Sequence, residues 1–291
     1  MLTNTNIVID NNNENKDIEE NFYEANCVIN NAGIWADFKD VSKEELLQRT
    51  VWRNNRLVTL EEANILFDSS GKPITPISTG KKGRGLLGKY GPNHACDPII
   101  TRFNPYKLRI EFISVKRNDT NEWAIPGGMV DPGEKVTQTL KREFTEEAVS
   151  NSDKKIIDQI FESNETILYC GPTYGDPRTT DCAWIETYVA NYHISHDLWS
   201  KIKLTNQPDE NTDVAWISCN SKDLYGDHSY FVKLAKKNAI KIICKKLLTL
   251  VAVIEVFIMI VIMYNIQYYK NNDTIMYNKY NDTDMYYNYE L

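Results

Sequence analysis

The sequence predicts an α/β sandwich, because β-rich segments lie on both sides of a segment whose residues recur at helical spacing. The expected strands cover residues 108–116, 122–125, 166–170, 183–190 and 214–218. A polar turn at residues 118–121 separates the first two strands, so we expect a hairpin that leads into a helix beginning near Val136. Apolar positions near helical spacing predict another helix over residues 230–241.

Two N-terminal regions precede this domain. Residues 1–21 are rich in Asn and acids and have too few apolar residues for a core, so we expect a disordered tail and not a targeting peptide. Residues 22–100 should form an extension packed on the main domain, with a helix at residues 43–48 and a strand pair within 53–67. A run rich in Gly and cations at residues 80–94 predicts a loop that approaches a ligand, with a flexible linker as the alternative.

The composition limits the classes of function. The chain has 291 residues, 42% of them hydrophobic, which is enough to bury a substantial core. A formal net charge of -7 argues against a nucleic-acid-binding surface. The six cysteines have neither zinc-ligand spacing nor a disulfide pattern, so they are interpreted as reduced cysteines of an intracellular protein.

Three glutamates in the central helix are the strongest chemical signal. Glu143, Glu146 and Glu147 have the spacing i, i+3 and i+4, which places them on one helix face within a turn of each other. Such a cluster repels itself unless a cation lies between its members, and carboxylate oxygens favour Mg²⁺ or Mn²⁺. A solvated helix face is the usual explanation of such a run, but it does not explain the Gly- and Pro-rich loop ahead of the helix.

That loop has its own physical role. Its glycines, Gly128 among them, let the backbone bend tightly and offer carbonyl or amide groups to a metal–phosphate assembly. Glu134 and Arg142 carry opposite charges, and a pair between them would tie the loop to the helix. Bound cations would in turn hold a diphosphate, activate a water and neutralise the leaving oxygen.

The string GGMVDPGEKVTQTLKREFTEE resembles the signature of the Nudix hydrolases, GX5EX7REUXEE, at every defined position up to Glu147. The usual Gly and aliphatic residue that follow are replaced by Val149 and Ser150. The resemblance implies an α/β/α sandwich with a mixed sheet over residues 101–240. It also implies that the three glutamates and Gly128 hold the metal. We assign the general base to Glu143, Glu146 and Glu147 collectively, and a carboxylate from a downstream loop is the alternative.

Four further stretches resemble the animal, mitochondrial-type ADP-ribose pyrophosphatase branch of that family: IWAD (34–37), GRGLLGKYGPNHACDPIITR (83–102), EWAIPGGMVDPGE (122–134) and GDPRTTDCAWIET (175–187). The resemblance implies Mg²⁺-dependent hydrolysis of ADP-ribose to AMP and ribose 5-phosphate. It places Arg178, Asp181 and Asp176 on the ribose-phosphate side, and Asn93 and Arg84 in a loop at the ligand cleft. A surface ion pair between Arg178 and Asp181 is the alternative explanation of those two residues.

Two other functions compete with this one. A related domain in melastatin-type cation channels binds ADP-ribose as a sensor, but the REF and EE elements that are degraded there are intact here, which favours catalysis. A Nudix hydrolase of another nucleoside diphosphate derivative is the second alternative.

A candidate transmembrane helix covers residues 245–266. Thirteen Leu, Ile, Val and Phe stand among residues 247–266, at about -0.3 to -0.6 kcal/mol each on the insertion scale, against one acid, Glu255, at about +2.5 to +3.5. Five lysines, at positions 236, 237, 241, 245 and 246, precede the apolar residues 247–266, so the catalytic domain should be cytosolic and tethered. A buried helix and translated non-coding sequence are the alternatives, and residues 267–291 should form a disordered tail.

Overall fold

This computed structural model describes residues 37, 41–149, 154–163, 165–209 and 211–286, with side chains up to residue 270. The expected tail at residues 1–21 and the IWAD stretch before Asp37 lie outside these ranges. The chain divides into two compact units, with the boundary between Ala239 and Ile240.

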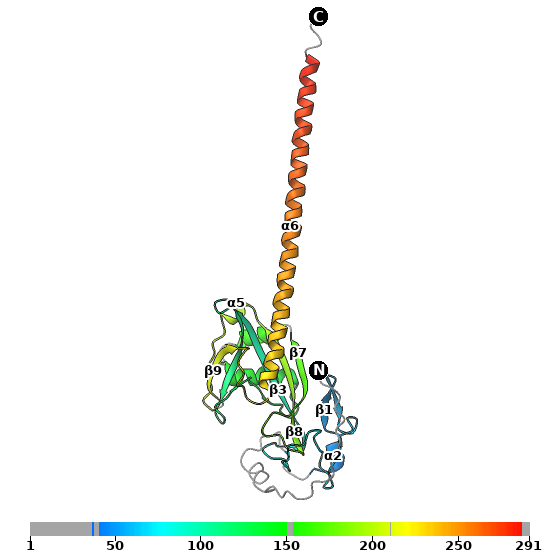
Figure 1. The fold of residues 1–291 in the computed structure, drawn as a ribbon, viewed down its shortest axis with the longest axis vertical. Coiled ribbons are helices and arrows are strands. Elements are labelled where there is room, and N and C mark those ends of the chain that lie inside the picture. Colours follow the sequence, from blue (N-terminus) through cyan, green and yellow to red (C-terminus); the bar gives the residue numbers. More distant parts are fainter. Residues whose placement is uncertain (1–36, 38–40, 150–153, 164, 210, 287–291) are drawn as a thin grey trace. The chain divides into compact units, whose positions relative to one another are not determined.

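The first unit is built around a seven-stranded mixed sheet (Figure 1). Its main strand order is β5-β4-β3-β8-β7, with β6 paired to β3 and β9 paired to β4. The strands are β3 (Gly91–Asn104), β4 (Arg109–Arg117), β5 (Trp123–Ala124), β6 (Gly128–Met129), β7 (Thr166–Thr173), β8 (Ala183–His193) and β9 (Asn211–Ser218). Among the strand pairs that the structure describes, only β3–β8 is parallel, so the expected mixed sheet is confirmed.

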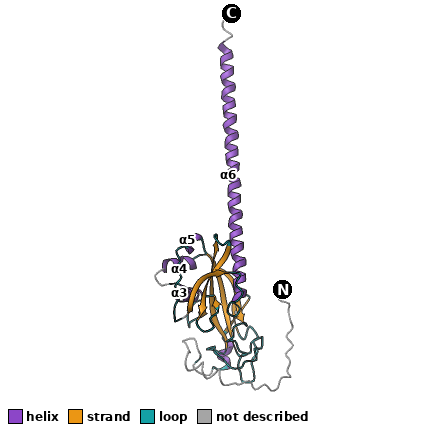
Figure 2. Cartoon of the chain, turned by 60° about the vertical axis from the view of Figure 1, so that its left-hand side comes forward, coloured by secondary structure: helices purple, strands orange, loops and turns teal. Residues whose placement is uncertain are grey.

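Helices cover both sides of this sheet (Figure 2). The helices α3 (Val136–Ala148), α4 (Lys154–Phe161) and α5 (His196–Trp199) lie on one side, and the first turns of α6 (His228–Tyr286) lie on the other. The helix α3 begins at the expected residue. Its buried Leu140 and Phe144 pack in the main core with Ile157 and Ile160 of α4. This burial leaves the opposite, glutamate-bearing face of α3 to the loop ahead of it.

The N-terminal extension packs on the sheet through a second apolar cluster. The helix α2 (Lys43–Leu47) carries a capping box, and a hairpin of β1 (Thr50–Arg53) and β2 (Arg56–Thr59) follows it. The expected helix is therefore present, but the strand pair starts and ends earlier than the expected 53–67. The reason is the pair Asn54 and Asn55, whose positive φ angles of 51° and 59° form the turn. Val51 and Leu60 pack against Trp184 of β8.

The strand β3 was not expected from the sequence. Residues 91–94 belong to it, so the expected loop at 80–94 is four residues longer than the loop in the structure. Most residues of β3 are buried, and β3 pairs with β8 along residues 91–101. A strand buried on both faces has no apolar–polar alternation, which is the pattern that reveals strands in a sequence.

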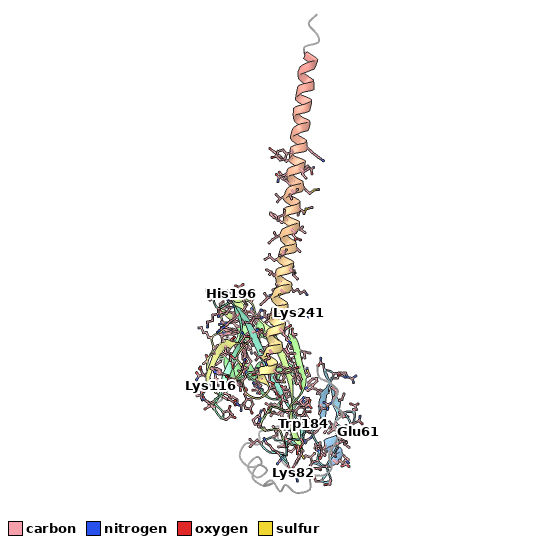
Figure 3. All side chains as sticks on the ribbon, in the orientation of Figure 1. Glu61, Lys82, Lys116, Trp184, His196 and Lys241 are labelled. Atoms are coloured by element: carbon pink, nitrogen blue, oxygen red, sulfur yellow. The ribbon has the colours of Figure 1, made fainter. Side chains whose placement is uncertain are left out.

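The helix α6 runs to Tyr286, where a disordered tail was expected from residue 267. No Gly or Pro follows Gly226, so the sequence contains no residue that ends a helix strongly. Residues 240–270 of the second unit include an apolar stretch with a mean hydropathy of 2.7. Its length and composition would allow it to cross a membrane. Figure 3 shows the side chains of this stretch radiating from the helix.

Candidate active site

The three predicted glutamates lie beside the glycine-containing loop, as the sequence led us to expect. They line a cavity of about 310 Å³ together with residues from the loop and β6. The lining consists of Gly127, Gly128, Met129, Asp131, Arg142, Glu143, Glu146 and Glu147. The helix α3 supplies the carboxylates because its spacing turns all three towards this loop, while its apolar face packs in the core.

Arg142 connects the loop to the helix. Its Nε and Nη2 donate to the two carboxylate oxygens of Glu134, both at 2.9 Å, and Nη2 also donates to the carbonyl of Met129 at 3.0 Å. The pair that the charges suggested is therefore present. The remaining nitrogen, Nη1, donates to Glu143 at 2.7 Å and to Glu146 at 3.1 Å. One guanidinium thus contacts three carboxylates.

Glu143 is the most buried of the three glutamates, with 8% of its surface exposed. Burial raises its pKa to about 7 although the contacts with Arg142 oppose this shift. Gly128 lies directly against it, and a Cβ at that position would overlap the Glu143 carboxylate. The contacts with Arg142 therefore do not fully offset the cost of burying Glu143 as an anion.

This donor set fits a hard divalent cation. Carboxylate oxygens are the ligands that Mg²⁺ and Mn²⁺ prefer, and a bound cation would supply the charge that Glu143 lacks. Within the described ranges, no three His, Cys, Asp or Glu side chains converge closely enough to hold a metal. Instead, Nη1 of Arg142 contacts the oxygens of Glu143 and Glu146. A cation at this place would replace those two contacts and leave the pair with Glu134 intact.

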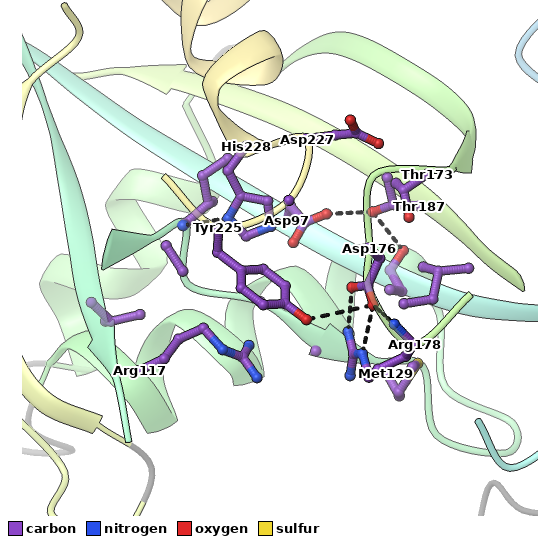
Figure 4. A pocket seen from close by; sticks show the side chains of 18 of the residues that line it. Asp97, Arg117, Met129, Thr173, Asp176, Arg178, Thr187, Tyr225, Asp227 and His228 are labelled. Atoms are coloured by element: carbon purple, nitrogen blue, oxygen red, sulfur yellow. Dashed lines mark hydrogen bonds and ion pairs between the residues drawn. The ribbon is translucent and has the colours of Figure 1, made fainter. Parts of the chain in front are cut away.

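A larger cavity of about 580 Å³ adjoins the first (Figure 4). Both cavities are lined by Gly127, Gly128, Met129 and Glu147. The polar side chains of the larger cavity are Asp97, Arg117, Asn118, Asp119, Glu147, Thr173, Asp176, Arg178, Thr187, Asp209, Tyr225, Asp227 and His228. A molecule in the larger cavity therefore lies next to Glu147 and close to the other carboxylates of α3.

Arg178 and Asp176, predicted as substrate residues, both line this larger cavity. They form a fork, in which Nε and Nη2 of Arg178 donate to the two oxygens of Asp176 at 2.9 and 2.8 Å. Burial alone would raise the pKa of Asp176, but the hydrogen bonds from Arg178 lower it below its ordinary value. Tyr225 also donates to Asp176, at 3.5 Å. Asp176 is thus an anion, held in place by Arg178.

Asp97 of β3 is a cavity residue that the sequence reasoning missed. Its carboxylate accepts a short hydrogen bond from Thr187 of β8, and it lies close to Gly127. Burial raises its pKa to about 6. The stretch at residues 83–102 that carries the family resemblance contains Asp97, so the signal was present in the sequence. The contact with Thr187 depends on pairing between strands far apart in the chain and could not be deduced locally.

His228, Tyr225 and Arg117 form another wall that was not predicted. The amide of Ile125 donates to Nδ1 of His228 at 2.9 Å, so the neutral ring carries its proton on Nε2. Burial lowers the pKa of His228 to about 4, which keeps the ring neutral near pH 7. The guanidinium of Arg117 lies 4.2 Å from the centre of the Tyr225 ring and also pairs with Asp119.

The other three predicted substrate residues, Asp181, Asn93 and Arg84, line neither of these two cavities. Asn93 is buried and bonds through its side chain to the backbone of Lys89, which closes the turn before β3. Arg84 donates to the carbonyls of Asp37 and Gly88. Asp181 accepts from backbone and hydroxyl groups of residues 78–80. In this structure, all three hold loops.

Comparisons with known proteins identify a domain and two similar proteins. Residues 106–234 match the NUDIX domain. Nudix hydrolase 6 of Caenorhabditis elegans is 47% identical over 170 residues, which are 57% of this chain and 64% of that protein. Mitochondrial ADP-ribose pyrophosphatase of Rattus norvegicus is 38% identical over 223 residues, which are 69% of this chain and 63% of that protein.

A channel protein is also similar. The transient receptor potential cation channel subfamily M member-like 2 of Nematostella vectensis is 43% identical over 188 residues, which are 57% of this chain but 12% of the channel. This chain spans less than two thirds of the length of each of these three relatives. The similarity to the channel therefore concerns one domain of a much longer protein.

Proposed function

Because this chain belongs to the Nudix family through its domain at residues 106–234, we propose that it hydrolyses ADP-ribose to AMP and ribose 5-phosphate with Mg²⁺ or Mn²⁺. One observation carries the proposal: the two cavities share lining residues. The glutamates of α3 therefore lie beside a cavity that is large enough for a nucleotide. The similarity to the rat ADP-ribose pyrophosphatase supports this choice of substrate.

The charges of the larger cavity support both the metal and a sugar-bearing substrate. Six acids and two arginines line it, and each arginine is already paired with an aspartate. A diphosphate cannot enter such an acidic cavity favourably unless divalent cations accompany it. The same acids are suitable acceptors for ribose hydroxyl groups, which donate hydrogen bonds. Acidic walls with a carboxylate metal site therefore favour a nucleoside diphosphate sugar.

The residues of this chain have distinct roles in the proposed reaction. Glu143, Glu146, Glu147 and the backbone of Gly128 would hold the cation, which would supply Lewis-acid stabilisation of the diphosphate and a more acidic water. Arg142, paired with Glu134, holds the loop against α3. We assign the acceptance of the water proton to the three glutamates together.

The contacts of the proposed substrate also follow from the cavity wall. Arg178, held by Asp176, presents a fixed cation to a phosphate or ribose oxygen. Asp97 and Asp176 are acceptors within reach of a ligand in the larger cavity. Because their positions are set by neighbouring side chains, little reorganisation is needed when a ligand binds.

An ADP-ribose sensor is the second candidate function, and the similarity to the channel protein is the observation that favours it. A sensor would bind ADP-ribose without consuming it. The intact glutamates of α3, which are ligands for a metal and not for the sugar, favour catalysis.

The test uses the full chain in detergent with ADP-ribose and Mg²⁺, and follows AMP by chromatography. We expect AMP formation that ceases when EDTA is added. Glu146→Gln and Glu147→Gln should abolish most of it, whereas Glu162→Gln, the same change at an exposed position of the chain, should not. Binding of ADP-ribose without AMP would establish the sensor, and cleavage of other nucleoside diphosphate derivatives in preference to ADP-ribose would correct the substrate.

We also propose that residues 247–266 anchor the protein in a membrane with the Nudix domain on the cytosolic side. The apolar window in this stretch has no buried residues, and its apolar side chains point in all directions around the helix, as in a helix that lies in lipid. Five lysines precede it, at positions 236, 237, 241, 245 and 246. The full chain should stay with membranes during alkaline carbonate extraction. A chain found entirely in the soluble fraction without detergent would exclude the anchor.

A further inference from the structure

The loop that carries Arg178 is held from outside by a segment of the N-terminal extension. Arg178 stands in the connection between β7 and β8, where turns and not regular pairing set the backbone. Residues 78–83, here called the strap, run along this connection. Since a loop takes its shape from its contacts, the strap is in a position to determine where Arg178 lies.

Two anchor points flank Arg178. On one side, the ammonium of Lys81 donates to the carbonyl of Pro177 at 2.6 Å. On the other, the Asp181 carboxylate accepts from the amide and hydroxyl of Thr79 and from the amide of Gly80, the last two at 2.9 and 3.2 Å. The backbone adds a third link, because the amide of Asp181 donates to the carbonyl of Lys81 at 2.7 Å. The strap is therefore hydrogen-bonded to both ends of the segment 177–181.

The close fit continues at the end of the strap. The hydroxyl of Thr180 donates to the carbonyl of Gly83 at 2.6 Å. Gly85 follows with a φ of +59°, and a Cβ there would come within 2.8 Å of a methyl carbon of Thr180. This region of the chain thus requires glycine for conformation and for space, as expected of a segment fitted to its neighbour.

We propose that Asp181 and Lys81 are positioning residues, which hold the strap against the Arg178 loop and thereby set the place of the Arg178 guanidinium in the larger cavity. The proposal rests on the proposed function, because one of its readouts is the KM for ADP-ribose. It differs from the family-based expectation that Asp181 itself accepts hydrogen bonds from the sugar. Asp181 acts through Arg178 and touches no substrate.

The first test is kinetic. Asp181→Ala should raise the KM for ADP-ribose about tenfold and leave kcat within about twofold, because a displaced Arg178 weakens binding throughout the reaction. Asp181→Asn should remain within about threefold of the wild type, since the amide oxygen of Asn can still accept from Thr79.

A double-mutant cycle separates positioning from general destabilisation. Adding Asp181→Ala to Arg178→Ala should raise KM no further, because the strap acts through the side chain that is already missing. Ser42→Ala is the matched control: it removes a side-chain hydrogen bond elsewhere in the N-terminal extension and should leave KM unchanged. Additive effects of the two substitutions on KM, or no rescue by Asn, would overturn the proposal.

Hydrogen exchange provides a readout that does not require hydrolysis. In the full chain, Asp181→Ala should increase deuterium uptake in peptides covering residues 175–180, and Ser42→Ala should not. If the wild type does not cleave ADP-ribose but this difference is observed, the proposed function fails and the positioning role stands. Unchanged uptake in these peptides would overturn the positioning role whatever the activity.

Discussion

Gly128 leaves room for the Glu143 carboxylate: a Cβ at position 128 would overlap both oxygens of that side chain. The glycine of the loop and the first glutamate of the trio are thus one fitted pair, although 15 positions separate them in the sequence. Gly128 has no positive φ in the structure, so its requirement is space and not conformation.

Gly128→Ala should therefore displace Glu143. We expect activity to fall by about a hundredfold and the free energy of unfolding to fall by about 1 to 3 kcal/mol. Chemical denaturation and the AMP assay measure the two effects. Gly71→Ala is the control, because it strains a glycine with a φ of +80° that has open space around it. If Gly128→Ala were as active as Gly71→Ala, the fitted pair would have no importance for the site.

Arg142→Lys should destabilise the protein despite the conserved charge. Lysine cannot reproduce the two parallel hydrogen bonds to Glu134 and also contact Glu143 and Glu146. Because Arg142 and Glu134 are both less than one third exposed, we expect a loss of about 2 kcal/mol in urea unfolding. Wild-type stability of this variant would mean that the loop does not depend on the fork.

Glu143 should make the metal-free protein less stable as the pH rises. Its folded pKa of about 7 lies above the ordinary value of 4.5, so its contribution favours folding below pH 4.5 and is lost as the pH passes through 7. Glu143→Gln should then become more stable than the wild type, by on the order of 3 kcal/mol at pH 8 without metal. Thermal unfolding of both proteins between pH 4.5 and 8 measures this difference. A constant difference over that range would contradict the assignment.

His228 should act in the opposite direction. Its folded pKa of about 4 lies below the ordinary 6.5, so its contribution to stability is complete above pH 6.5 and is lost as the pH falls through 4. The cause is burial, and protonation would also place a second donor opposite the amide of Ile125. His228→Gln should remove this pH-dependent loss of unfolding free energy, which is on the order of 3 kcal/mol. An identical acid unfolding profile for both proteins would refute the neutral tautomer.

The sequence allowed the fold class and the acidic helix to be predicted, because both depend on local spacing. Glu143 and Glu147 stand four residues apart, and helix geometry alone brings them to one face. Asp97 could not be placed in the same way. Its strand is buried on both sides, and its contact with Thr187 depends on the parallel pairing of β3 and β8.

Asp181 illustrates a different limit. Its residue type suits a sugar ligand, and so does its place near Arg178 in the sequence. The structure instead directs its carboxylate to the strap, over a separation of about a hundred residues. Residue type predicts which atoms can be bound, but only the fold determines which neighbour binds them.

The most direct test of the account is calorimetric titration of Mg²⁺ and Mn²⁺ into the full chain in detergent, with and without a non-hydrolysable ADP-ribose analogue. We expect binding to the wild type that is tighter when the analogue is present and that is lost in the Glu146→Gln, Glu147→Gln double variant. Absence of binding by both cations in the wild type, in either condition, would contradict the assignment of α3 as a metal site.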